Sequence, residues 1–112
     1  MKIVNLTDTE WSQVSHNPAI RKRIILSQGE LPGITTLSQA IFKPGDVATG
    51  HAHQDMSEVF LVAAGEGIIR LNGQEYPLNP DIVAVAEPND VHEIENTGDN
   101  PLILTYFGVR TI

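Results

Sequence analysis

Glycine and proline interrupt this chain every few residues, and their spacing limits the folds that the sequence can adopt. The 112 residues include 9 glycines and 7 prolines, and helical periodicity is weak throughout. Short runs rich in β-branched and aromatic residues lie between them, at 34–42, 58–63, 67–71, 74–78, 82–86 and 102–109. Many short strands separated by turns predict an all-β sandwich, jelly roll or barrel.

Two local patterns refine this prediction. Asn72-Gly73 separates two of the runs, and Asn-Gly favours a tight hairpin because both residues tolerate a positive φ. The region around 8–14 is the only segment that we expect to form a short helix, which Thr9 would cap and Trp11 would pack onto the barrel.

Length, charge and cysteine content narrow the class of protein. The length predicts one domain over residues 1–112. A net charge of −7, from 14 acidic and 7 basic residues, argues against a nucleic-acid partner. No apolar run is long enough for a membrane span, and the early polar residues do not resemble a signal peptide, so we expect a cytoplasmic protein. The absence of cysteine excludes disulfides and zinc-thiolate sites.

One basic cluster, Arg21-Lys22-Arg23, has two interpretations. It forms either a solvated strand or turn edge, which is the more common case, or an anion clamp at the mouth of the barrel.

The segment His51-Ala52-His53 is the first candidate for chemistry. Residues two apart in a strand point to the same face, so both imidazoles can bind one metal ion. Glu58 follows after a turn and begins an apolar run, 59–62, in which a buried carboxylate needs a compensating charge. His92, which follows another turn, would complete the set if its strand lies across the barrel from His51.

Three imidazoles and one carboxylate suit a single divalent transition-metal ion. This mixed nitrogen and oxygen set accommodates manganese, iron, nickel, cobalt, copper or zinc, and the sequence does not choose among them.

The spacing of these residues resembles the first motif of the cupin superfamily. The pattern Gly45-x5-His51-x-His53-x4-Glu58-x6-Gly65 matches that motif at every fixed position. The resemblance implies a double-stranded β-helix, that is, a small jelly-roll barrel, in a single cupin domain with its motifs at about 45–96.

Residues 81–96 resemble the second cupin motif with departures at its turn. His92 and Asn96 stand at the expected spacing, Pro88 is one place late, and Asn89 replaces an inner glycine. Asn visits left-handed conformations readily, so this replacement is compatible with the turn. By this resemblance the metal ligands are His51, His53, Glu58 and His92.

Alternation along the strand after Glu58 predicts that Phe60 and Val62 face inward and that Val59, Leu61 and Ala63 face outward. Because both faces of this strand are apolar, a second subunit is the simplest cover, and we expect a homodimer. The candidates for the pocket lining are Met56, Phe60, Tyr106 and Phe107, and Ser38 or Gln39 could place a polar group beside the metal.

Two functions remain open at this point. The first is a metalloenzyme, such as a metal-dependent dioxygenase or isomerase, that acts on a small oxygen-rich molecule. The second is a module that binds or senses a small molecule and holds a non-catalytic metal. The sequence identifies no second acid or base, so the catalytic residues stay unknown and the fold alone does not decide between the two.

Overall fold

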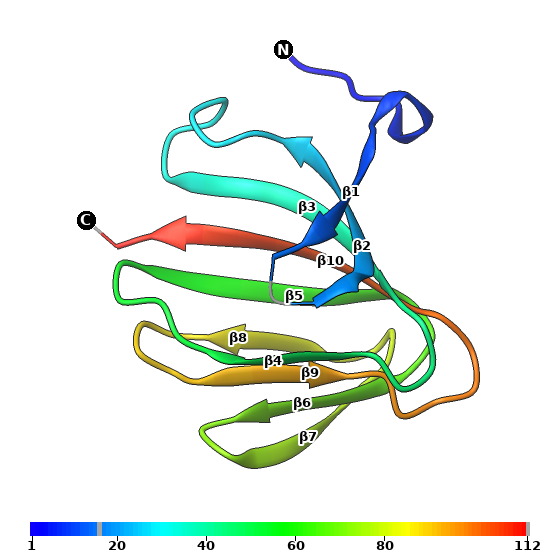
Figure 1. The fold of residues 1–112 in the computed structure, drawn as a ribbon. Helices are drawn as coiled ribbons and strands as arrows, with labels where there is room; N and C mark the ends of the chain where they lie inside the picture. The colour runs from blue at the N-terminus through cyan, green and yellow to red at the C-terminus, as the bar shows by residue number, and fades with distance from the viewer. Residues whose placement is uncertain (16, 112) are drawn as a thin grey trace.

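The computed structural model describes residues 1–15 and 17–111, and it confirms the expected all-β cupin-type fold (Figure 1). A 3-10 turn, η1 (Leu6–Asp8), precedes the strands. The six-stranded sheet, in spatial order, contains β1 (Trp11–Val14), β2 (Asn17–Leu26), β3 (Ile34–Phe42), β10 (Leu102–Arg110), β5 (Met56–Ala64) and β8 (Val83–Ala86). The four-stranded sheet, in spatial order, contains β4 (Val47–His51), β9 (His92–Glu95), β6 (Gly67–Leu71) and β7 (Gln74–Leu78).

All described strand pairs are antiparallel, and the two sheets are not joined into one continuous hydrogen-bonded barrel. The sheets face each other across the core, as in a jelly roll (Figure 1). Alternation along β5 has the expected phase, because Phe60 is 4% exposed whereas Leu61 is 38% exposed. The core contains inward side chains of both sheets, among them Ile20, Phe42, Ile69, Ile94, Leu102 and Leu104.

The two predicted turns have the backbone that their residues favour. Asn72 has a φ of 53° and Gly73 a φ of 82°, which matches the hairpin expected between β6 and β7. Asn89, the residue in the place of a motif glycine, has a φ of 71°, so asparagine here adopts the left-handed conformation.

The short helix expected around 8–14 is wrong. The helical turn covers only Leu6–Asp8, and Trp11–Val14 is an edge strand that pairs with β2. Strand pairing overrides the weak local helix signal here, because Trp11 lies opposite Arg23 and its ring packs against two guanidinium groups. The guanidinium carbons of Arg21 and Arg23 lie 5.0 and 4.5 Å from the Trp11 ring centroid. Among the described residues, no helix is long and apolar enough to cross a membrane.

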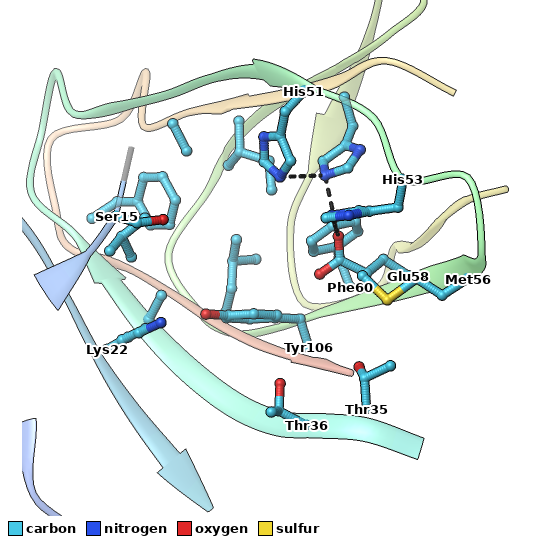
Figure 2. A pocket seen from close by; sticks show the side chains of 17 residues that line it. Ser15, Lys22, Thr35, Thr36, His51, His53, Met56, Glu58, Phe60 and Tyr106 are labelled. Carbon is cyan, nitrogen blue, oxygen red and sulfur yellow. Dashed lines mark hydrogen bonds and ion pairs between the residues drawn. The ribbon is translucent and has the colours of Figure 1, made fainter. Parts of the chain in front are cut away.

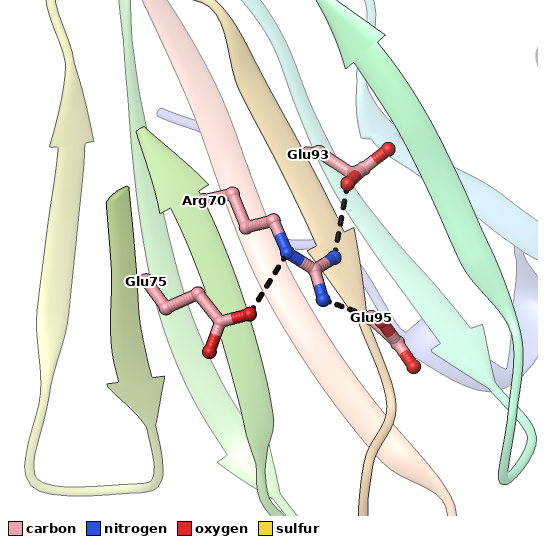
Figure 3. A network of polar contacts seen from close by, with 4 residues as sticks. All are labelled: Arg70, Glu75, Glu93 and Glu95. Carbon is pink, nitrogen blue, oxygen red and sulfur yellow. Dashed lines mark hydrogen bonds and ion pairs between the residues drawn. The ribbon is translucent and has the colours of Figure 1, made fainter. Parts of the chain in front are cut away.

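A polar network covers part of the outer face of the four-stranded sheet (Figure 3). Arg70 on β6 donates to Glu75, Glu93 and Glu95, at 3.2, 2.9 and 2.9 Å. These hydrogen bonds, that of Glu95 first, raise the pKa of Arg70 above its ordinary value. Arg70 therefore offsets part of the negative charge that three neighbouring glutamates would otherwise place on one face.

Asn96 ties the segment after β9 to both neighbouring loops. It is 1% exposed, and its side-chain amide donates to the carbonyl oxygens of Phe42 and Asn100 at 2.9 and 2.8 Å. Its side-chain oxygen also accepts from the backbone N–H of Gly98 at 2.9 Å. The second-motif asparagine is thus a structural residue that fixes a loop between the sheets.

Replacing Asn96 with alanine should therefore destabilise the fold strongly. The change leaves buried backbone groups without partners, each of which costs about 1–3 kcal/mol, so we expect a loss of roughly 2–4 kcal/mol. Urea denaturation followed by circular dichroism measures this loss. Asn100→Ala is the control, because Asn96 bonds only the backbone carbonyl of that residue and the stability should change little.

Candidate metal centre

Two of the four predicted ligands lie on adjacent strands of the four-stranded sheet. His51 ends β4 and His92 begins β9, and the two residues are partners in the strand register. Their Nε2 atoms lie 3.1 Å apart. His92 is 3% exposed, so this pair lies at the inner face of the sheet.

The other two candidates complete the cluster. His53 lies in the segment after β4, and Glu58 lies on β5 of the six-stranded sheet. The Oε1 atom of Glu58 lies 3.2 Å from Nε2 of His53 and 3.2 Å from Nε2 of His92. One potential ligand atom from each of the four residues lies within 4.8 Å of the others.

Backbone carbonyl groups orient two of the imidazoles. Nδ1 of His51 lies 3.1 Å from the carbonyl oxygen of Thr49, and Nδ1 of His92 lies 3.4 Å from that of Asp90. A carbonyl oxygen only accepts, so Nδ1 must carry the proton in each contact. The Nε2 atoms then present their lone pairs to the cluster, which is the arrangement that metal-binding histidines use.

The state of Glu58 fits a metal ion. Its Oε1 is buried and accepts no hydrogen bond from any group in the described part of the chain. A buried carboxylate oxygen without a partner is costly unless a positive charge compensates it. A divalent ion held by His51, His53, Glu58 and His92 would supply that charge, so these residues could hold one.

A cavity of about 190 Å³ opens beside the cluster, between the two sheets (Figure 2). Of the candidates for the pocket lining, Met56, Phe60 and Tyr106 are among its lining residues. The rings of Phe60 and Tyr106 stack with their centroids 6.1 Å apart. The ring centroids of Phe60 and His92 lie 5.6 Å apart. Phe107 is not among its lining residues, because it follows Tyr106 on β10 and pairs with Val59 on the outer face.

Comparison with known proteins decides the family. The model of the cupin domain family matches residues 38–108, more than half of the chain. The chain is a cupin. A 59-residue segment is 32% identical to an oxalate-binding protein of Thermotoga maritima, and the match spans 53% of this chain and 49%, about half, of that protein. An uncharacterised protein of Methanocaldococcus jannaschii is 27% identical over 108 residues, 91% of this chain and 82% of that protein.

Solved structures agree with this fold. A predicted oxalate decarboxylase of Thermotoga maritima superposes with a TM-score of 0.91 at 20% identity, over 98% of this chain and 100% of that chain. KdgF from Halomonas sp. superposes with a TM-score of 0.81 at 22% identity, over 99% of this chain and 96% of that chain. At 20–22% identity, these two similarities show a shared fold and no more.

Tyr106 gives the cavity a neutral hydroxyl. Burial first and the charge of Glu58 second raise the pKa of Tyr106 to about 12, and a hydrogen bond with Ser38 opposes this only in part. The phenol therefore keeps its proton at neutral pH and can donate a hydrogen bond to a ligand oxygen. Of the two polar candidates on β3, Ser38 is 2% exposed and faces inward, whereas Gln39 accepts from Arg23.

The structure divides the basic cluster of the cupin between two faces. Lys22 lines the cavity, whereas Arg21 and Arg23 lie against Trp11. Sequence reasoning did not select among the three residues, although alternation along the strand separates them once its phase is known. The lining residues that it missed include the small or polar Ser15, Thr35, Thr36 and Ala48 and larger apolar residues such as Phe42, Ile94 and Leu104.

Proposed function

We propose that this cupin binds one divalent transition-metal ion through His51, His53, Glu58 and His92, and uses it to bind a small, oxygen-rich carboxylate. The observation that carries the proposal is the buried Oε1 of Glu58, which lies 3.2 Å from two imidazole nitrogens and has no hydrogen-bond donor among the described residues. The bound ion would supply Lewis-acid chemistry and a template for oxygen ligands.

The surroundings of the cluster support a small ligand. The volume of about 190 Å³ equals roughly six water molecules at about 30 Å³ each. Phe60, which is 4% exposed, places an apolar ring on one side, and Tyr106 offers a neutral hydrogen-bond donor. The names of two similar proteins, oxalate-binding protein and predicted oxalate decarboxylase, favour a carboxylate among oxygen-rich molecules.

Two uses of such binding follow from the sequence. The ligand is either a substrate, in a reaction of the oxygenase or isomerase type, or the signal of a binding or sensing module with a non-catalytic metal. The cavity favours the first use, because it lies directly beside the cluster and leaves room for a substrate, whereas a structural ion is normally enclosed by protein ligands. Among the described lining residues Glu58 is the sole carboxylate, so a reaction would depend on the ion and the Tyr106 hydroxyl for proton and charge control.

Metal analysis and calorimetry test the proposal together. Protein stripped with a chelator is loaded separately with manganese, iron, cobalt, nickel, copper or zinc, and bound metal is measured by mass spectrometry. We expect one ion per chain, and we expect oxalate to bind the loaded protein and not the stripped protein. Uptake of no metal, or equal oxalate binding with and without metal, would contradict the proposal. Incubation of the loaded protein with oxalate under air, followed by NMR, then separates conversion from binding.

We also propose that the cupin forms a homodimer through the outer face of β5 and β8. Leu61, Val83 and Val85 are 38%, 58% and 45% exposed there, and register pairs Leu61 with Val83 and Val59 with Val85. Four adjacent apolar side chains at the edge of a sheet favour association with a second copy.

Sedimentation tests this association. At micromolar concentration we expect about twice the chain mass of 12.2 kDa for the wild-type protein, and about the chain mass for Val83→Lys. Tyr76→Lys, on exposed β7, is the control that should remain dimeric. A wild-type protein that sediments as a monomer would contradict the dimer.

A further inference from the structure

Lys22 brings a positive charge to the cavity from the side opposite the metal cluster. It lies on β2, opposite the buried Ala40 of β3 in the strand register, so its side chain shares the inward face. Figure 2 shows its ammonium group pointing into the cavity, on the side that the Tyr106 hydroxyl faces and away from Glu58.

No acidic group neutralises this ammonium in the part of the chain that the structure describes. Lys22 takes part in no ion pair there, although the chain has 14 acidic residues. The sole carboxylate among the described lining residues is Glu58, which belongs to the metal cluster. The arginines on either side have partners of their own, since both lie against Trp11 and Arg23 also donates to Gln39.

The net positive charge of a metal-loaded cavity favours a ligand with two negative charges. With a divalent ion in place, the ion and Lys22 outweigh Glu58 by about two positive charges in a partly enclosed cavity. Such an excess is unfavourable away from water unless a ligand compensates it. A second negative group near Lys22 and the Tyr106 hydroxyl would receive a charge-assisted hydrogen bond and a neutral one.

We propose that the ligand of this cupin is a dicarboxylate with separated carboxylates, one bound at the metal cluster and the other by Lys22 and Tyr106. The inference rests on the proposed function and names its ligand class. Oxalate is too short for this arrangement, because its adjacent carboxylates both chelate one ion. A 2-hydroxy- or 2-oxo-dicarboxylate offers a chelating end like that of oxalate and a distal carboxylate for Lys22.

Malate and lactate form a matched pair of probes. Both carry a 2-hydroxycarboxylate that can chelate the ion, and malate alone carries a distal carboxylate. Calorimetry with manganese-loaded wild-type protein should show malate binding at least about 10-fold more tightly than lactate. Lys22→Gln should weaken malate binding by about 10- to 100-fold, the range of a charge-assisted hydrogen bond, and leave lactate, oxalate and bound manganese unchanged.

Lys43→Gln is the matched control, since Lys43 is an exposed lysine outside the cavity and its removal should leave malate binding unchanged. The melting temperature of Lys22→Gln should equal that of the wild type, because the ammonium forms no ion pair with the described residues and the backbone carbonyl that accepts from Ser12 is kept. A loss of malate binding therefore would not reflect unfolding.

The outcomes separate this inference from the function on which it rests. If oxalate binding depends on metal but malate and lactate bind wild type equally, or Lys22→Gln weakens both equally or neither, the dicarboxylate inference alone is wrong. If the protein takes up no metal, or stripped and loaded protein bind these acids alike, the proposed function and the dicarboxylate inference are both wrong.

Discussion

Removing the metal with a chelator at about pH 7.5 should lower the melting temperature of the wild-type protein by about 10 °C. An ion present at a hundredfold excess over its Kd stabilises the folded state by about 2.7 kcal/mol, because it binds the assembled cluster and not the unfolded chain. For a domain of this length about 1 kcal/mol corresponds to roughly 4 °C. Adding back a divalent ion should restore the lost stability, as followed by differential scanning calorimetry.

The same experiment on His53→Ala identifies the site of this effect. His53 lies in a loop segment after β4, with a side chain that is 33% exposed, so alanine should leave the fold intact. The variant should lose most of its response to metal and chelator, whereas Gln54→Ala, the exposed neighbour, should respond like the wild type. Equal melting temperatures of wild-type protein with chelator and with manganese, iron, nickel and zinc would remove the physical basis of the metal centre.

Glu58→Gln should change stability in opposite directions with and without metal. In metal-free protein the buried Oε1 of Glu58 has no hydrogen-bond donor among the described residues, so a neutral amide should raise the free energy of unfolding by about 1 kcal/mol. In the presence of metal the same change removes a charged ligand and should weaken metal binding by at least about 100-fold, so the loaded wild type should be more stable than the loaded variant.

Chemical denaturation at about pH 8, where histidine is ordinarily neutral, measures both effects. Glu10→Gln is the control, since Glu10 is an exposed carboxylate, and it should shift stability by less than about 0.5 kcal/mol in either condition. A metal-free Glu58→Gln protein that is less stable than the wild type would mean that the carboxylate has a structural partner.

The strands that sequence reasoning found are those with a strong local pattern. The Asn72-Gly73 turn predicts the bounds of β6 and β7, and the run at 34–42 coincides with β3. β2 has no such signal, because the basic run Arg21-Lys22-Arg23 interrupts its apolar residues and Lys22 takes an inward position that the alternation would give to an apolar side chain. β1 was missed for a related reason: its strand character depends on pairing with β2, which lies beyond local sequence.

The four ligand candidates were predictable because their spacing carries the chemistry. His51 and His53 stand two apart, at the end of β4 and just after it, and Glu58 lies near the start of β5, which belongs to the other sheet. The residues that β3 and β10 contribute to the cavity were not predictable in the same way. Which of Ser38 and Gln39 faces inward, or whether Tyr106 rather than Phe107 reaches the cavity, depends on how the two sheets pack, and an error of one residue reverses the answer.

Lys22 lies between two outward arginines on β2. A substitution in this part of the strand keeps the strand register, whereas an insertion changes it. One residue added before Lys22 would exchange the faces of the strand and turn the Arg21 or Arg23 side chain toward the cavity. Beyond Ile24 the register with β3 already shifts, so a bulge there can absorb an extra residue. We therefore expect relatives that bind other ligands to differ in the length of β2 only near its C-terminal end. At the centre of the strand we expect them to differ in side-chain identity.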